Sequence, residues 1–167
     1  MKEEIIDIVD DHDNVVRQAT WYEMHKKGLT HRSANVFVFN SKGEIFVHKR
    51  AKNLALYPGM HDVKMGGIAK AGESYEDAAK RELKEEAGIE NAKLDYLFSF
   101  KFRRRQNNNN RKVFKCVYDG KMNLQKEEVE SGRFMKIAEA KRLQKEGKLS
   151  PSADAVFKEL LKSEGTK

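Results

Sequence analysis

The chain has 167 residues, of which 39% are hydrophobic and 35% are charged, and it carries a net charge of +7. This length suits one domain with its own hydrophobic core, and the composition excludes a collagen, a coiled coil and a disordered chain. No stretch approaches about 18 apolar residues, which excludes a membrane-spanning helix, and a single cysteine, Cys116, excludes an internal disulfide.

The first half of the chain predicts strands and one short helix. Ile5 to Val9 predicts a strand, and the capping-box spacing of Thr20 and Glu23 predicts a helix from about Trp21 to Lys27. Partial alternation over residues 34–40 and 44–50, on either side of a Ser-Lys-Gly turn, predicts a hairpin. A loop broken by Pro58-Gly59 follows over residues 51–62.

The second half predicts the longest and clearest helix, which opens at Ser74 and ends at Gly88. Further strands are expected at 93–102, 112–118 and 132–137, with amphipathic helices at 138–146 and 153–163. Residues 103–111 are expected to form a polar loop between the first two of these strands. Interleaved strands and helices predict a sheet covered by helices on its faces, in one domain over residues 1–167.

Three carboxylates share one face of the helix that opens at Ser74. Glu82, Glu85 and Glu86 stand at i, i+3 and i+4, so they repel one another unless something offsets their charge. Mg²⁺ prefers clustered carboxylate oxygens together with substrate phosphates. The alternative is an ordinary solvated helix in which Lys80, Arg81 and Lys84 pair with these glutamates.

The residues before this helix favour the metal site. Gly67 is followed by five residues, Glu73, seven residues and then Arg81-Glu82-Leu83-Lys84-Glu85-Glu86-Ala87-Gly88-Ile89. This string over residues 67–89 resembles the Nudix box at every specified position. The resemblance implies the Nudix fold, an α/β architecture in which a mixed β-sheet is sandwiched between α-helices. It also implies the activity of that superfamily, hydrolysis of a diphosphate linked to another moiety with Mg²⁺ or Mn²⁺.

The same resemblance assigns roles to individual residues. Glu82, Glu85 and Glu86 would be side-chain metal ligands, one of them also acting as the base toward water, and the carbonyl of Gly66 would be a further ligand. Arg81 would orient Glu73 or Glu82, which completes the catalytic set. Metal ions lower the pKa of bound water and neutralise charge on phosphate oxygens.

A narrower similarity lies outside the box. His25 to Arg32, Lys49-Arg50 and Tyr57 to Gly59 resemble the Nudix branch related to isopentenyl-diphosphate isomerase. The isomerases carry a catalytic cysteine and a metal-binding histidine where this chain has Gly66 and Ile68. We therefore favour a hydrolase over an isomerase.

Four arginines are weaker candidates for substrate binding. Arg50 matches a phosphate-contacting arginine of that branch, and its alternative is a solvated strand end. Arg103, Arg104 and Arg105 lie in a segment, 103–112, with five cationic residues and none acidic. They would hold the distal phosphates of the substrate, or else form a flexible solvated tip.

The partners and location follow from these features. We expect a small-molecule diphosphate as substrate, no membrane contact, and a cytoplasmic protein, because the acidic start does not resemble a secretory signal and cysteine is scarce. The alternatives are an RNA pyrophosphohydrolase, which the basic charge permits although no RNA-binding motif is present, and a catalytically silent module that binds diphosphate ligands. Nothing in the residues indicates an oligomeric state.

Overall fold

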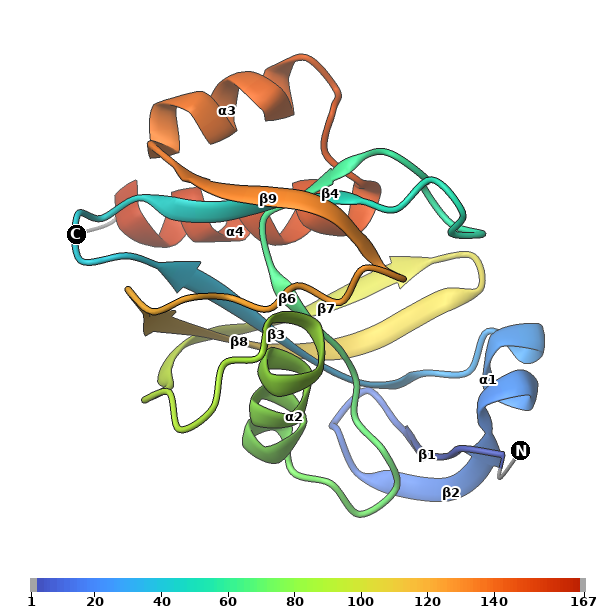
Figure 1. The fold of residues 1–167 in the computed structure, drawn as a ribbon. Helices are drawn as coiled ribbons and strands as arrows, with labels where there is room; N and C mark the ends of the chain where they lie inside the picture. Colours follow the sequence, from blue (N-terminus) through green and yellow to red (C-terminus); the bar gives the residue numbers. More distant parts are fainter. Residues whose placement is uncertain (1–2, 166–167) are drawn as a thin grey trace.

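The computed structural model describes residues 3–165 as nine strands and four helices (Figure 1). The strands are β1 (Ile5–Val9), β2 (Val15–Thr20), β3 (His31–Phe39), β4 (Ile45–Arg50), β5 (His61–Asp62), β6 (Met65–Ile68), β7 (Asp95–Arg104), β8 (Asn107–Val117) and β9 (Val129–Met135). The helices are α1 (Trp21–Lys27), α2 (Tyr75–Ala87), α3 (Ile137–Lys145) and α4 (Pro151–Gly165). Within the described residues, no helix has the length and apolar character needed to cross a membrane.

Strand β3 is the centre of the sheet. It pairs with β8 in parallel along its whole length and with β6 antiparallel over Ser33 to Val36. The predicted hairpin is only partly right, because β3 and β4 pair only at Phe39 and Ile45 beside the turn. Beyond that point β4 turns away and pairs with β9 and β5. The two strands therefore separate, since each has a longer partner elsewhere.

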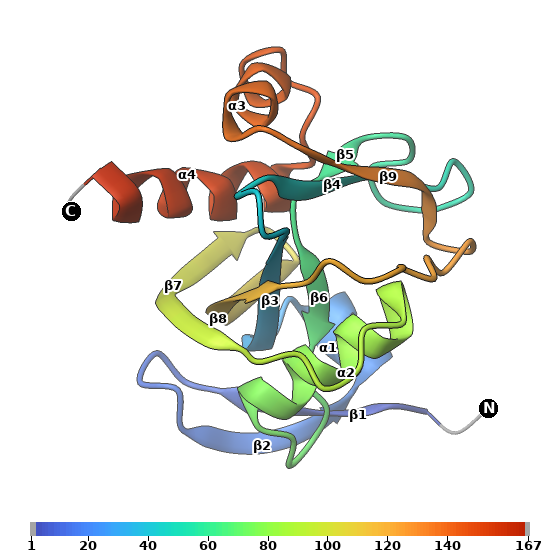
Figure 2. The same cartoon turned by 60° about the vertical axis from the view of Figure 1, so that its left-hand side comes forward.

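The side chains of β3 alternate between two hydrophobic cores. Ala34, Val36 and Val38 pack in the core formed with α2, whereas Phe37 packs with Phe157 of α4 in the second core. Figures 1 and 2 show α2 on one side of β3, with α3 and α4 on the other. The expected fold class, a mixed sheet between helices, is confirmed.

The segment 103–111 is not the polar loop that the asparagine run predicts. Strand β7 continues to Arg104 and β8 begins at Asn107, so only Arg105 and Gln106 form the turn. Asn109, Asn110 and Arg111 are buried. Asparagine is poor in strands because its amide competes for backbone groups. Here β8 is paired on both sides, by β3 and β7, and its buried amides find partners, which overrides that preference.

Strand β2 was not predicted from the sequence. It pairs with β1 at the edge of the sheet, and its residues Val15 to Gln18 are exposed. An exposed edge strand shows little alternation of buried and exposed side chains, which is why its periodicity carries no signal.

Two histidines are buried in the fold. His31 on β3 and His48 on β4 are 2% and 5% exposed. Burial lowers the pKa of each from 6.5 to about 4, against the opposing effects of the Leu29 carbonyl on His31 and of Asp62 on His48. Both rings are therefore neutral in the folded protein at neutral pH.

This burial predicts that the protein loses stability in weak acid. The unfolded chain protonates these rings near pH 6.5 and the folded chain only near pH 4. Their contribution is therefore complete above pH 6.5 and is lost as the pH falls toward 4, by up to about 3 kcal/mol per ring. We expect the urea midpoint to fall between pH 7 and pH 4.5, and His48→Gln to flatten that dependence. An identical dependence in the variant would contradict this assignment.

Candidate active site

Helix α2 presents the glutamates at the edge of a packed layer. Its N-cap Ser74 accepts a hydrogen bond from the Asp77 amide, and Gly88 ends the helix in a left-handed conformation (φ 66°). Ala79, Leu83 and Ala87 are buried in the core against β3 and β6. This stripe fixes the rotation of the helix, so the adjoining face with the glutamates points along the border of the core.

Two consecutive glycines of β6 allow α2 to come close. Gly66 has φ 136°, and a Cβ there would overlap the backbone of Ala34 on β3. At Gly67, a Cβ would lie 2.6 Å from Oε1 of Glu82. The amide of Gly66 donates a hydrogen bond to Oε2 of Glu86 at 3.3 Å. The glycine pair thus brings the backbone of β6 against two of the glutamates.

Arg81 links the remaining acidic residues. Its Nε and Nη2 donate to the two carboxylate oxygens of Glu73, at 2.8 and 3.0 Å. Its Nη1 donates to Glu82 at 2.6 Å and to Glu85 at 3.2 Å, and Nη2 also reaches the carbonyl of Ile68 at 3.0 Å. The single guanidinium therefore holds three carboxylates and the loop after β6 in one network.

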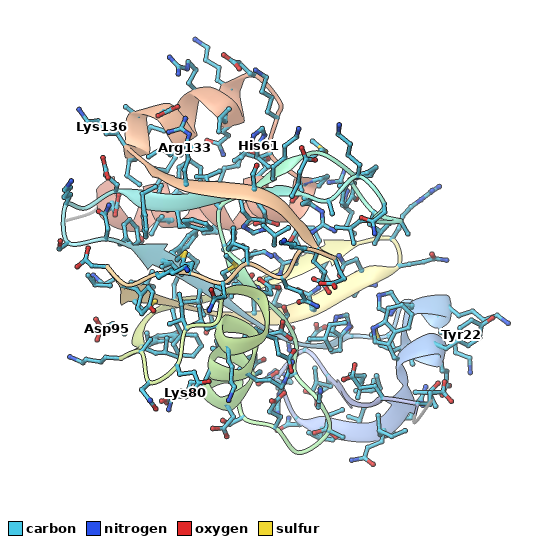
Figure 3. The ribbon with its side chains drawn as sticks, viewed as in Figure 1. Tyr22, His61, Lys80, Asp95, Arg133 and Lys136 are labelled. Carbon is cyan, nitrogen blue, oxygen red and sulfur yellow. The ribbon has the colours of Figure 1, made fainter. Side chains whose placement is uncertain are left out.

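The lysines of α2 do not neutralise this face. Lys80, labelled in Figure 3, lies on the outer side of the helix and pairs with Glu76 at 2.7 Å. Lys84 pairs with Glu90 at 3.0 Å. Glu82 keeps only 13% of its side chain exposed. The alternative of a solvated helix is therefore right for Arg81, which pairs with Glu82 and Glu85, but wrong for the two lysines.

Burial and mutual repulsion set the protonation of the carboxylates. Burial raises the pKa of Glu86 well above its usual range, and the charges of Glu82 and Glu128 add to the effect. Burial also raises the pKa of Glu82, although Arg81 opposes this. Burial acts in the same direction on Glu73, but hydrogen bonds from Arg81 and the Lys70 amide prevail and lower its pKa. The ionised forms of Glu82 and Glu86 are thus disfavoured, whereas that of Glu73 is stabilised.

The donor set fits a hard divalent cation. It consists of carboxylate oxygens and backbone beside glycine, with no sulfur or imidazole. The raised pKa values of Glu82 and Glu86 indicate carboxylates that would gain from a positive charge. Among residues 3–165, no three His, Cys, Asp or Glu side chains are already grouped as a metal site. Binding therefore requires these side chains to turn from their present partners, Arg81 and the Gly66 amide.

Glu128 is an additional carboxylate, which the sequence marks as a possible contributor to the site but not as a catalytic residue. It stands just before β9, is exposed, and accepts a hydrogen bond from the Ala51 amide through its carbonyl at 2.9 Å. Its charge raises the pKa of both Glu82 and Glu86. Its position before a strand, next to Glu127, is the signal that marks it in the sequence.

The four arginines predicted to bind substrate do not form one group. Nε and Nη2 of Arg50 both donate to the carbonyl of Leu56. These bonds hold the β4–β5 loop against the end of β4. Arg103 pairs with Asp11 at 3.1 Å. Arg104 points to the opposite face of β7 from Arg103, and Arg105 lies in the turn at φ 43°. Successive side chains of a strand point to opposite faces, so Arg103, Arg104 and Arg105 do not face one direction as the residues of a flexible loop could.

The comparisons with known proteins agree with this geometry. The NUDIX domain profile matches residues 29–159. The chain belongs to the Nudix family. It is 38% identical over 133 residues to an uncharacterized Nudix hydrolase of Pseudomonas aeruginosa, covering 80% of this chain and 79% of that protein. An uncharacterized Nudix hydrolase of Streptomyces coelicolor is 37% identical over 142 residues, covering 82% of this chain and 77% of that protein.

Solved structures show the same Nudix fold. The crystal structure of DR0079 from Deinococcus radiodurans superposes with a TM-score of 0.81 at 23% identity, over 93% of this chain and 98% of that one. The MutT protein of Methanosarcina mazei gives a TM-score of 0.69 at 22% identity, over 83% of this chain and 96% of that one. The protein is therefore a Nudix-type hydrolase, of a family whose chemistry is diphosphate hydrolysis.

Proposed function

We propose that this Nudix hydrolase cleaves a diphosphate linkage in a small, X-linked diphosphate such as a nucleoside diphosphate derivative. Glu82, Glu85, Glu86 and the carbonyl of Gly66 would hold Mg²⁺ or Mn²⁺. The observation that carries the proposal is the crowding of half-buried carboxylates against the glycine backbone of β6. When bound, the cation lowers the pKa of water and neutralises charge on the phosphate oxygens.

The glutamates, Arg81 and Glu73 would have different roles in the reaction. One of the three glutamates Glu82, Glu85 and Glu86 takes a proton from the attacking water. The water oxygen bonds to phosphorus, and the bond between phosphorus and the oxygen of the leaving phosphate breaks. Without a cation, Nη1 of Arg81 keeps Glu82 and Glu85 beside this site. When these two side chains turn toward a cation, Nε and Nη2 of Arg81 would stay bonded to Glu73. Glu73 acts through Arg81, and we assign it to positioning.

We also propose that this chain is related to the isomerase-like branch but catalyses hydrolysis. The isomerases use a cysteine thiol as an acid and a histidine as a metal ligand. The matching positions of this chain, in β6, are Gly66 and Ile68. Cys116 cannot substitute, because it is buried on β8 in the core beside α2. Incubation with isopentenyl diphosphate in D₂O with Mg²⁺ is expected to give no deuterium incorporation.

The proposal is tested by a substrate screen with Mg²⁺ and Mn²⁺. The panel contains nucleoside di- and triphosphates, nucleotide sugars, dinucleoside polyphosphates, coenzyme A and prenyl diphosphates. Triphosphorylated RNA provides the arm for a nucleic-acid substrate. Metal-dependent release of phosphate or a monophosphate from a small molecule is expected. Turnover of RNA alone, or tight binding of a diphosphate without turnover, would overturn the assignment.

We further propose that Arg50, Arg103, Arg104 and Arg105 contribute to substrate binding. Replacing Arg103, Arg104 and Arg105 together by alanine is expected to raise KM about tenfold, because losing a hydrogen bond to a charged group costs about 1.5–3 kcal/mol. The melting temperature should change little, since the Asp11 pair of Arg103 is exposed.

Arg103→Ala alone is compared with this triple change. Its side chain already has partners in Asp11 and Asn110. We expect the KM of the single variant to rise less than that of the triple variant. If the triple variant has the wild-type KM for several substrates, the tip of the β7–β8 hairpin does not bind substrate.

A further inference from the structure

A buried ion pair between β5 and β6 has no role in the proposed reaction. Asp62, on β5, is 2% exposed, and Lys64 has 11% of its side chain exposed. Lys64 Nζ lies 3.6 Å from Oδ2 of Asp62. Among the described residues, Lys64 is the one cation within ion-pair distance of this carboxylate.

The carboxylate is fixed on several sides. Its Oδ1 accepts a hydrogen bond from the Lys64 amide at 3.1 Å, and its Oδ2 accepts one from the Ser150 hydroxyl at 3.4 Å. Burial raises its pKa, but the charge of Lys64 and the hydrogen bond from the Lys64 amide oppose this, so the pKa is lowered and the group is ionised. A charged, immobile carboxylate therefore holds the Lys64 ammonium from the side of β5.

Lys64 also stands close to the predicted metal ligands. It precedes Gly66 by two residues, and the Gly66 amide donates to Glu86. The charge of Lys64 lowers the pKa of Glu86 against the effect of burial. A lysine ammonium is a compact charge on a flexible stem. Released from Asp62, it would pair with Glu86 and compete with a divalent cation for that carboxylate.

We infer that Asp62 is a positioning residue that retains the Lys64 ammonium, so that Glu86 stays available to the metal ion. The inference rests on the proposed metal site. It assigns to Asp62 an electrostatic role distinct from its role in the turn between β5 and β6.

Mn²⁺ binding by the protein without substrate tests this, followed by the paramagnetic resonance signal of free Mn²⁺. Asp62→Asn keeps a side-chain oxygen for the Lys64 amide and removes the charge. We expect its Mn²⁺ dissociation constant to rise at least about tenfold, as for the loss of one close charge interaction. Adding Lys64→Met to this variant removes the competitor, and affinity is expected to return to within about twofold of the wild type.

The other outcomes are also decisive. Wild-type affinity in Asp62→Asn overturns the inference, as does equal weakening in the single and double variants, which would show that only turn geometry matters. If Asp62→Asn does not fold, Lys64→Met alone decides, with equal or tighter Mn²⁺ binding in support and weaker binding against. Glu86→Gln reports separately on the metal site, because Mn²⁺ binding that is unaffected there contradicts the proposed function itself.

Discussion

Replacing Glu86 by glutamine is expected to lower kcat by at least about 100-fold. Glutamine keeps the shape of the side chain and its acceptor oxygen but loses the charge that holds a cation or accepts a proton. The same change at Glu85 should have an effect of similar size, although Glu85 is half exposed and is held by Arg81 at 3.2 Å. Steady-state kinetics at saturating Mg²⁺ and substrate measure both.

Stability provides a second measurement on the Glu86 variant. Burial and Glu82 raise the pKa of Glu86, so its ionised form opposes folding at neutral pH in the absence of metal. Glu86→Gln should therefore melt at the same temperature as the wild type or above it. Loss of activity without loss of stability separates a catalytic role from a structural one.

Glu76→Gln is the matched control. Glu76 lies on the same helix but is exposed and pairs with Lys80. We expect it to keep full activity, because a surface pair contributes about 0–1 kcal/mol to stability and nothing to the site. Full activity in Glu85→Gln and Glu86→Gln as well would remove the basis for the proposed site.

The sequence predicted the parts of the molecule whose signals are local. The helix at α2 follows from its serine and glycine caps and its apolar stripe, and the structure places both caps where they were expected. The spacing of the box predicts where Gly67, Glu73 and Arg81 lie relative to one another, because a helix and a tight loop have a defined geometry. The contact of Arg81 with both Glu73 and Glu82 could not be chosen from spacing alone.

The parts that were missed depend on contacts between distant segments. Asn109 and Arg111 are buried because β8 lies between β3 and β7, which a polar run does not reveal. Arg111 is 3% exposed, donates to Asn109 and Ser152, and has its guanidinium 4.2 Å from the centre of the Phe102 ring. Burial lowers its pKa to about 10. Tertiary pairing thus overrode a local preference for turn.

The two glycines before the helix are expected to respond to alanine in different ways. At Gly66 a Cβ would overlap the carbonyl of Ala34 and approach the Cα of Asn35 at 2.9 Å, and both belong to the backbone of a central strand. At Gly67 the obstacle is the carboxylate of Glu82, which is the end of a flexible side chain. The first clash must move the sheet, whereas the second can be relieved by a rotamer change.

Gly66→Ala should therefore lower the free energy of unfolding by about 3 kcal/mol or more, from left-handed strain together with overpacking. Gly67→Ala should fold with nearly wild-type stability but lose about 100-fold in kcat, because a displacement of about 1 Å in a catalytic group has effects of that size. Urea unfolding and steady-state kinetics on both proteins measure the contrast.

Gly72→Ala separates strain from overlap. Gly72 has φ 76°, and a Cβ there would have no neighbour within 4 Å. We expect it to lose only about 1–2 kcal/mol, the cost of the left-handed conformation. If Gly66→Ala is no worse than Gly72→Ala, β6 is not pressed against β3 as described. If Gly67→Ala keeps full activity, Glu82 does not need its place beside the glycine, and the cation must be held by Glu85, Glu86 and other groups.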